Sequence, residues 1–269
     1  MRVGSLCTGY GGLEMGIEQA FGPIDLVFVS DIDKDVGTLL AHHHPDTPNL
    51  GDLTKVNWEK QQPVDLLCAG YPCQPFSKAG LRKGEEDDRA IFGWIATGVS
   101  VLRPRYLFLE NVPNHLALGG AGVIAEITRL GYDCRWGIVR ASDAGAPHKR
   151  ARLFIWAQPT DTGGEGLQGL RGECELGAGE KSQHTAWHDY ELSIRRWEQI
   201  TGRPAPVPAN SKGVEPAFIV GMLGLAEGHV TGLGLSRTAE VKMLGNGVVP
   251  QQAALALHYL TQERVSNAA

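Results

Sequence analysis

"VDLLCAG" at residues 64–70 and "RYLFLEN" at residues 105–111 are two nearly continuous apolar runs. Short apolar runs without alternation are typical of strands that are buried on both faces of a parallel sheet. A segment with helical spacing lies between them, at about residues 90–102. Strand, helix and strand in succession form the repeating unit of α/β folds. The two runs therefore predict the centre of a mostly parallel sheet that helices cover on both faces.

The same alternation continues on both sides of this unit. Apolar spacing of period 3.6 indicates helices, and shorter apolar runs indicate strands. The residue that precedes the second helix, Asp33, has a side chain suited to capping it. We expect strands at 3–7, 25–30, 133–140 and 150–158, and helices at 13–21, 33–43 and 121–131.

The pattern breaks after Gln158. The next residues are rich in glycine and charge, with one candidate helix at 191–200 and a proline-rich connector behind it. An amphipathic helix returns at 251–263. The sequence thus predicts a doubly wound, Rossmann-like α/β core formed by residues 1–157 plus 236–269, which a small irregular region at 158–235 interrupts.

Composition limits the class of protein. The chain has 269 residues, 42% hydrophobic and 20% charged, as soluble globular proteins have. Its net charge of −5 gives no overall basic signature, so any nucleic acid would bind a local patch. Five cysteines without a C-x-x-C pair argue against a disulfide framework or a cysteine zinc site. No apolar run approaches the roughly 20 residues of a membrane span, and we see no secretory leader, so we expect a cytoplasmic protein without a membrane partner.

A glycine-rich turn, "SLCTGYGGLEMG", follows the first expected strand. Gly9 and Gly11 would let a ligand approach the backbone near a helix N-terminus. Asp31, at the end of the second strand, is placed to accept hydrogen bonds from a ribose. The third glycine of a dinucleotide fingerprint is replaced by Glu14, which favours a nucleoside cofactor. A glycine turn beside a surface acid remains the alternative interpretation.

A cysteine directly after a proline marks the end of the central strand. Cys73 stands between Pro72 and Pro75 in "GYPCQPFS", where open α/β sheets place their sites, and a thiol there could act as a nucleophile. A packing cysteine in a turn is the alternative. Glu110 ends the next strand and would lie at the same edge of the sheet. Arg150 and Arg152 would share a face if their segment is extended.

Taken in order along the chain, the motifs resemble those of the cytosine-5 DNA methyltransferase family of bacterial and phage type. The resemblance spans nearly the whole chain and is most specific in "PCQPFS" and "ENV". The motifs are "GYGG", "SDID", "GDLT", "GYPCQPFS", "DDRAIF", "ENV", "HKRAR" and "LGNGVVP". It implies a core that binds S-adenosylmethionine and an insert that recognises the DNA target.

The resemblance also implies a covalent mechanism. The Cys73 thiolate attacks carbon 6 of cytosine, and Glu110 protonates or hydrogen-bonds ring N3. Arg152 holds the exocyclic O2, while Arg150 assists it or steadies the loop. Carbon 5 then takes the methyl group of S-adenosylmethionine, and elimination releases Cys73. Because the target carbon lies within the base stack, the base must be flipped out of the duplex.

The family places further residues around cofactor and DNA. Asp31 takes the ribose, Ile32 packs on the adenine and Asp52 faces its amino group. An aromatic residue is usual where Cys7 stands, so one adenine contact is weaker or replaced. The remaining expected cofactor residues are Gly9, Gly11, Gly12, Leu53, Asn246 and Val248.

Residues 74–92 resemble a mobile loop that closes over the flipped base, with Gly80 and Gly84 in its pattern. In "HKRAR", His148 and Ala151 replace the usual glutamine and glutamate. We expect site recognition within 158–235. Expected DNA contacts are Gln74, Ser77, Arg89, Arg195 and Arg196, and further specificity candidates are Arg171, Gln183 and Arg203.

Two other functions remain compatible with the sequence. A tRNA cytosine methyltransferase shares the cysteine and "ENV" motifs, although no aromatic-rich RNA-stacking signature is identifiable. An inactive homologue that only binds DNA is the second, and the intact Cys73, Glu110 and Arg152 argue against it. We expect a monomer that acts on double-stranded DNA without a metal ion. The three histidines at 42–44 cannot all face one ion, and a cognate restriction endonuclease is left open as a partner.

Overall fold

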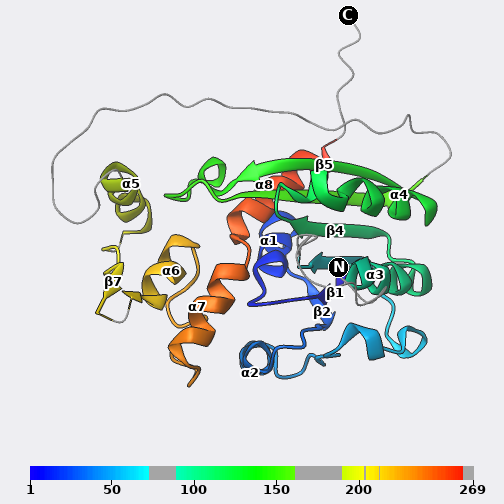
Figure 1. The fold of residues 1–269 in the computed structure, drawn as a ribbon, viewed down its shortest axis with the longest axis horizontal. Helices are drawn as coiled ribbons and strands as arrows, with labels where there is room; N and C mark the ends of the chain where they lie inside the picture. The colour runs from blue at the N-terminus through cyan, green and yellow to red at the C-terminus, as the bar shows by residue number, and fades with distance from the viewer. Residues whose placement is uncertain (73–88, 161–189, 203, 212, 263–269) are drawn as a thin grey trace, which may run out of the picture.

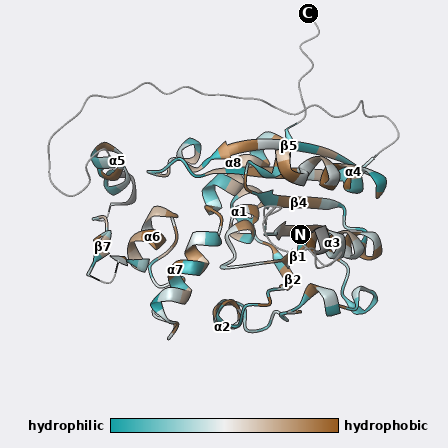
Figure 2. Ribbon diagram, in the orientation of Figure 1, coloured by the Kyte–Doolittle hydropathy of each residue, from teal (hydrophilic) through white to brown (hydrophobic). Residues whose placement is uncertain are grey.

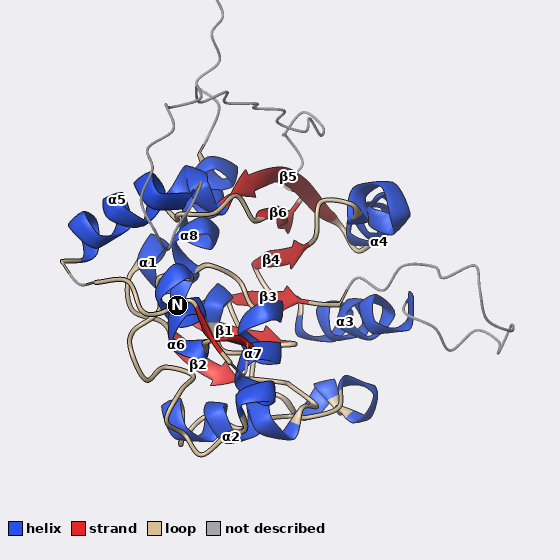
Figure 3. Ribbon diagram, turned by 60° about the vertical axis from the view of Figure 1, so that its left-hand side comes forward, coloured by secondary structure: helices blue, strands red, loops and turns tan. Residues whose placement is uncertain are grey.

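A computed structural model describes residues 1–72, 89–160, 190–202, 204–211 and 213–262. At its centre lies a six-stranded sheet, which Figure 3 shows nearly edge-on with the strands stacked above one another. The strand order is β2-β1-β3-β4-β6-β5. The strands are β1 (Arg2–Leu6), β2 (Asp25–Phe28), β3 (Leu66–Gly70), β4 (Tyr106–Asn111), β5 (Tyr132–Arg140) and β6 (Ala151–Pro159).

The two apolar runs form the middle of this sheet, as predicted. Strand β3 pairs in parallel with both β1 and β4, and β1 pairs in parallel with β2. Strand β6 is antiparallel to both β4 and β5, so it is the one strand of the six that runs in the opposite direction. The sheet is therefore mostly parallel, with a reversed strand next to the one that carries Glu110.

Helices cover both faces of the sheet (Figure 3). On one face, α1 (Gly12–Phe21) and α8 (Pro250–Thr261) pack against apolar side chains such as Phe108 and Phe154. On the other, α3 (Arg89–Leu102) and α4 (Ala121–Arg129) pack against Leu67, Leu107 and Leu109. The predicted doubly wound, Rossmann-like α/β fold is confirmed.

The second helix begins as its cap predicts. The Asp33 carboxylate accepts a hydrogen bond from the backbone N–H of Asp35 at 2.9 Å and caps α2 (Lys34–His43). Short single turns complete the core at Leu53–Lys55, Trp58–Lys60, Leu116–Gly120 and Ala141–Ala144. Two helices were not predicted, α6 (Pro216–Met222) and α7 (Arg237–Asn246).

A small group of elements lies to one side of the sheet, and α7 lies between this group and the sheet (Figure 1). The group consists of helix α5 (Glu191–Thr201), helix α6 and the short strand pair β7 (Ala209–Asn210) and β8 (Gly213–Val214). Figure 2 shows hydrophilic and hydrophobic residues side by side on α5. Ile194 and Trp197 of this helix form a small apolar cluster with Met222. Val220 and Leu223 instead pack with core residues, so part of the region predicted as an insert adheres to the core. Within the described residues, no helix combines the length and apolar character needed to cross a bilayer.

Candidate active site

The carboxyl ends of the central strands meet at one edge of the sheet. Gly70, the last residue of β3, stands opposite Glu110 of β4 in the parallel register. A Cβ at Gly70 would lie 3.4 Å from Glu110 Oε2 and 3.9 Å from the Cys7 carbonyl oxygen, which follows β1. The ends of β1, β3 and β4 are thus within contact distance, at the edge where open α/β sheets bind ligands.

An ion pair joins the expected catalytic acid to one of the two arginines. Arg152 Nε lies 2.8 Å from Glu110 Oε1, and both side chains are largely buried, at 15% and 8% exposed. Glu110 stands opposite Phe154 in the antiparallel register of β4 and β6. Because residues two apart on a strand share a face, Arg152 is the diagonal neighbour of Glu110.

Burial raises the pKa of the Glu110 carboxyl to about 7, against the lowering effects of Arg152 and then Arg150. The charged form loses hydration that the two arginines only partly replace. A carboxyl with a pKa near neutrality can both donate and accept a proton at physiological pH. Glu110 therefore has the acidity that a general acid needs.

Arg150 is directed elsewhere. Its backbone φ is 24°, so the chain bends before β6 and the condition for a face shared with Arg152 is not met. Its Nη2 donates hydrogen bonds to the carbonyl oxygens of Gly245 at 2.7 Å and Gly247 at 2.6 Å. Gln252 fixes the same bend, because its Nε2 donates to the Arg150 carbonyl oxygen at 2.8 Å. Arg150 thus ties the site to the turn after α7.

The glycine turn and Asp31 are joined by a direct hydrogen bond. The backbone N–H of Gly9 donates to Asp31 Oδ2 at 2.9 Å. Asp31 Oδ1 accepts from the backbone N–H of Asp33 at 3.0 Å. Each carboxylate oxygen retains a second lone pair, so Asp31 can still accept a hydroxyl donor. The predicted ribose acceptor lies beside the predicted glycine turn.

The geometry of this turn fits a bound nucleoside group. Gly9 and Gly11 have φ of 57° and 85°, which favour glycine. A Cβ at Gly9 would meet nothing within 4 Å, so the backbone there is open to a ligand. A Cβ at Gly12 would overlap the Val248 carbonyl oxygen, so glycine also permits close approach of the turn after α7. The cradle is built from two segments that are far apart in the sequence.

The other expected cofactor residues differ in exposure. Ile32, in the segment between β2 and α2, is 73% exposed and available for stacking, and Asn246 is exposed at the end of α7. Leu53, by contrast, is buried in the core. The Asp52 carboxylate accepts from the backbone N–H of Thr54 at 3.0 Å, which together with the Thr54 hydroxyl lowers its pKa. Burial, and then Asp31, raise the pKa of the Cys7 thiol to about 12, so this thiol stays neutral.

The nucleophile expected from the sequence, Cys73, lies outside the described residues, as do Gln74 and Ser77. The chain is held firmly just before it. Asn111 Nδ2 donates to the Tyr71 carbonyl oxygen at 3.1 Å, and the Tyr71 hydroxyl is 2.9 Å from His115 Nε2. Tyr71 is therefore fixed through backbone and side chain two residues before Cys73.

The expected DNA contacts on α5 are not equivalent. The Arg195 guanidinium is paired with Glu191 at 2.8 Å and Glu198 at 3.0 Å on the same helix. Arg196 is exposed and has no ion pair with any residue in the described ranges. Arg89 is the first residue of α3. The specificity candidates Arg171, Gln183 and Arg203 fall outside the described residues.

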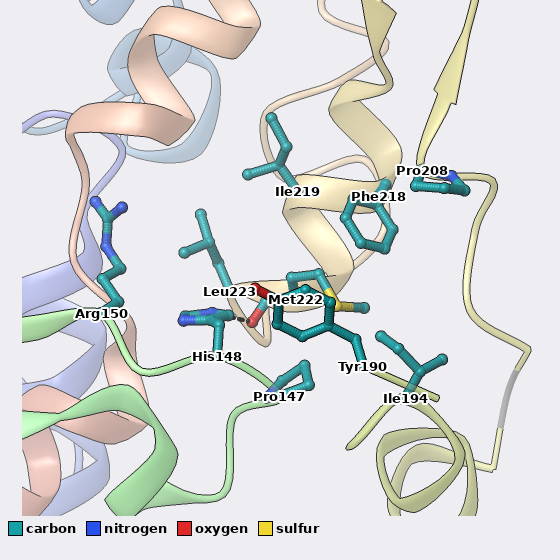
Figure 4. A pocket seen from close by; sticks show the side chains of 10 residues that line it. All are labelled: Pro147, His148, Arg150, Tyr190, Ile194, Pro208, Phe218, Ile219, Met222 and Leu223. Atoms are coloured by element: carbon teal, nitrogen blue, oxygen red, sulfur yellow. Dashed lines mark hydrogen bonds between the residues drawn. The ribbon is translucent and has the colours of Figure 1, made fainter. Parts of the chain in front are cut away.

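An apolar pocket of about 620 Å³ lies between α5, α6 and the segment before β6 (Figure 4). His148 Nε2 donates to the Met222 carbonyl oxygen at 2.9 Å on its wall, as the dashed line in Figure 4 marks. Figure 4 shows the Arg150 side chain at its margin, directed away from Phe218. Only Arg150 is shared with the site, because Glu110 and Arg152 do not line the pocket.

The histidine run at 42–44 does not gather around an ion. His43 Nε2 donates to the His229 carbonyl oxygen at 2.7 Å, and the two rings stack. Among the described residues, no group of three histidines, cysteines or acids has the arrangement of a metal site.

Two residues with long-range contacts, Tyr10 and Gln252, were not predicted from the sequence. Tyr10 bridges the glycine turn to Val248, and Gln252 ties α8 to the segment before β6. An aromatic residue between two glycines in "GYGG" was the only signal for Tyr10. Gln252 looked like a polar position on an amphipathic helix, yet it is fully buried.

Comparisons with known proteins identify the family. The model of the "C-5 cytosine-specific DNA methylase" family matches residues 1–191, which include Asp31, Glu110 and Arg152. A type II methyltransferase of Neisseria lactamica, M.NlaX, is 36% identical over 161 residues, which are 57% of this chain and 51% of that protein. One of Lentzea aerocolonigenes, M.NaeI, is 32% identical over 192 residues, 63% of this chain and 46% of that protein.

The chain spans about half the length of these curated relatives. Among solved structures, a Spodoptera frugiperda DNMT2 mutant superposes with a TM-score of 0.68 at 14% identity, covering 97% of this chain and 99% of that one. This likeness supports the fold. Because the family model matches well over half of the sequence, the chain belongs to the C-5 cytosine-specific DNA methylase family.

Proposed function

We propose that the protein transfers a methyl group from S-adenosylmethionine to carbon 5 of cytosine in double-stranded DNA. The observation that carries this proposal is the buried pair of Glu110 and Arg152 beside the glycine turn. The pair offers a carboxyl with a pKa of about 7 and a fixed guanidinium within one small volume. Cytosine presents a ring nitrogen and an exocyclic oxygen as neighbours, which suit these two groups.

In this proposal, the Cys73 thiolate adds to carbon 6 of a flipped cytosine and forms a carbon–sulfur bond. Glu110 gives its proton to ring N3, and Arg152 donates a hydrogen bond to O2 as electron density moves toward carbon 5. When bound, S-adenosylmethionine would supply an electrophilic methyl group to carbon 5 and leave as the neutral thioether. A base then removes the carbon 5 proton, the carbon–sulfur bond breaks, and N3 returns its proton to Glu110.

The cofactor is assigned to the cradle at the strand ends. Gly9 leaves its backbone open to the amino-acid part, Gly11 and Gly12 shape the turn beside it, and Asp31 accepts from the ribose. Ile32 supplies an exposed apolar face for the adenine. Asn246 and Val248 close the cradle from the other end of the chain. Arg150 holds the carbonyl oxygens of this second turn and acts as a structural support.

The deciding experiment uses tritiated S-adenosylmethionine with duplex DNA, and with tRNA in a parallel reaction. We expect label on DNA, abolished in Cys73→Ser and retained in Cys174→Ser, a cysteine outside the family motifs. Duplex DNA with 5-fluorocytosine at the target should trap a covalent complex through Cys73, because fluorine cannot leave as a proton does. Label on tRNA alone would make RNA the substrate, and DNA binding without any transfer would make the chain an inactive homologue.

A further inference from the structure

Tyr10 is a buried side chain in the middle of the glycine turn. It lies between Gly9 and Gly11, and only 1% of it is exposed. Its hydroxyl donates a hydrogen bond to the Val248 carbonyl oxygen at 2.6 Å. A buried hydroxyl usually has such a partner, because an unpaired one costs free energy. Here the partner belongs to the turn after α7, at the far end of the sequence.

The Tyr10 ring also packs directly on that turn. A Cβ at Gly247 would fall within the ring, so only glycine at position 247 permits the contact. The Val248 carbonyl oxygen that accepts from Tyr10 is the same atom that a Cβ at Gly12 would overlap. Hydroxyl, ring and backbone therefore fix the distance between the two turns.

Other residues hold the backbone of Tyr10 in place. His229 Nε2 donates to the Tyr10 carbonyl oxygen at 2.9 Å. The His229 ring stacks on His43 with a centroid distance of 4.3 Å and an interplanar angle of 20°. His43 in turn donates to the His229 carbonyl oxygen. Tyr10 is thus anchored at its main chain and at its hydroxyl.

Arg150 also holds the end of α7 and the turn after it, through hydrogen bonds to the carbonyl oxygens of Gly245 and Gly247. We propose that Tyr10 is a positioning residue that closes the cofactor cradle by holding residues 245–248 against the glycine turn at 9–12. This inference rests on the proposed function, because it takes S-adenosylmethionine as the ligand of the cradle. The effect of Tyr10 is exerted through Val248 and Gly247.

The test compares Tyr10→Phe with Tyr132→Phe. Tyr132 is a matched control, because it is equally buried and its hydroxyl donates to the Pro104 carbonyl oxygen at 2.7 Å, far along the chain from the cradle. Three quantities are measured for each protein: the Kd of S-adenosylmethionine by calorimetry, the Tm, and ligand-free deuterium exchange of residues 245–249.

We expect both variants to lose Tm to a similar extent. Only Tyr10→Phe should raise the Kd, by about tenfold or 1.4 kcal/mol, and only it should speed exchange within residues 245–249. A merely structural role would lower the Tm without moving the Kd. An unchanged Kd and exchange rate in Tyr10→Phe, or an equal change in both variants, would overturn the role of Tyr10. Wild-type protein that binds no S-adenosylmethionine would instead remove the proposed function, and with it the cofactor role of Tyr10.

Discussion

Glu110 and Arg152 lie on antiparallel neighbouring strands, and their side chains meet at 2.8 Å in a nearly buried ion pair. The reversed direction of β6 is what brings them together. It sets Phe154 opposite Glu110 and leaves Arg152 diagonal to it on the same face. The pairing register of β4 and β6 therefore fixes the proposed general acid, Glu110, relative to Arg152, the proposed hydrogen-bond donor to O2.

Replacing Glu110 by glutamine should lower turnover by about 100-fold or more, the usual contribution of a general acid. In the wild type, activity that needs the protonated carboxyl should fall as pH rises through about 7, the pKa that burial imposes. Initial rates of label transfer between pH 5 and 9 measure both effects. The alkaline limb should be absent in Glu110→Gln.

The matched control is Glu126→Gln on α4. In the wild type, the Glu126 carboxylate forms a surface ion pair with Arg129. The control variant should keep both the wild-type rate and the pH profile. An alkaline limb that persists in Glu110→Gln would assign it to another group.

The raised pKa of Glu110 also implies an effect on protein stability. This stabilisation is fully present below about pH 4.5 and is lost as pH rises through about 7.

Asp31→Ala should weaken the binding of S-adenosylmethionine by at least about tenfold. The variant loses the acceptor for the Gly9 N–H and for the ribose, and hydrogen bonds to a charged group contribute about 1.5–3 kcal/mol each. Calorimetry measures the change. The control is Asp25→Ala at the start of β2, where Asp25 forms a loose surface pair with Arg2 at 3.9 Å, and this variant should bind normally. Equal affinities in the two variants would remove Asp31 from the site.

Gly12→Ala should destabilise the protein by about 1–3 kcal/mol, as overpacking does. The new methyl group would press on the Val248 carbonyl oxygen, which is main chain and cannot rotate away. Gly122→Ala on α4 is the control, because its Cβ meets nothing within 4 Å, and it should gain about 0.5–1 kcal/mol. Urea unfolding gives both values. A Gly12→Ala protein as stable as the wild type would show that the two turns can separate freely.

We predict that Arg196, rather than Arg195, contributes to DNA recognition. Both side chains are exposed, but the Arg195 guanidinium is paired with two glutamates on α5, whereas Arg196 has no ion pair within the described residues. Arg196→Ala should relax the methylated site, or weaken binding to all sequences if it contacts only phosphate. Arg195→Ala should leave the site unchanged. Sequencing of methylated DNA after expression of each variant identifies the methylated site. A changed site in Arg195→Ala alone would contradict the prediction.

Much of the core could be predicted because its signals are local. Continuous apolar runs predicted β3 and β4, and the capping side chain of Asp33 predicted the start of α2. Helix α7 escaped prediction because its sequence has little amphipathic periodicity. Helix α6 is one short apolar stretch after a proline, which does not distinguish a helix from a strand.

The site was predictable in its residue types more than in its contacts. The ends of parallel strands placed Asp31 and Glu110 at one edge, in accordance with a general rule of α/β sheets. The separation of the two arginines was not foreseeable, because the Arg150 side chain binds carbonyl oxygens nearly a hundred positions away. Tyr10 escaped notice for the same reason, since its partner is Val248.

The cradle joins residues 9–12 to residues 245–248, and this large sequence separation has a consequence for protein synthesis. A nascent chain on the ribosome can pair β1, β3 and β4 once those strands have emerged, because domains begin to fold from the N-terminus. It still lacks the turn at 245–248 that Tyr10 and Arg150 hold. Glu110 and the glycine turn would thus be in place well before the cradle is complete. The ability to bind the cofactor would arise only after residue 248 has emerged, when the strands of the sheet are already available.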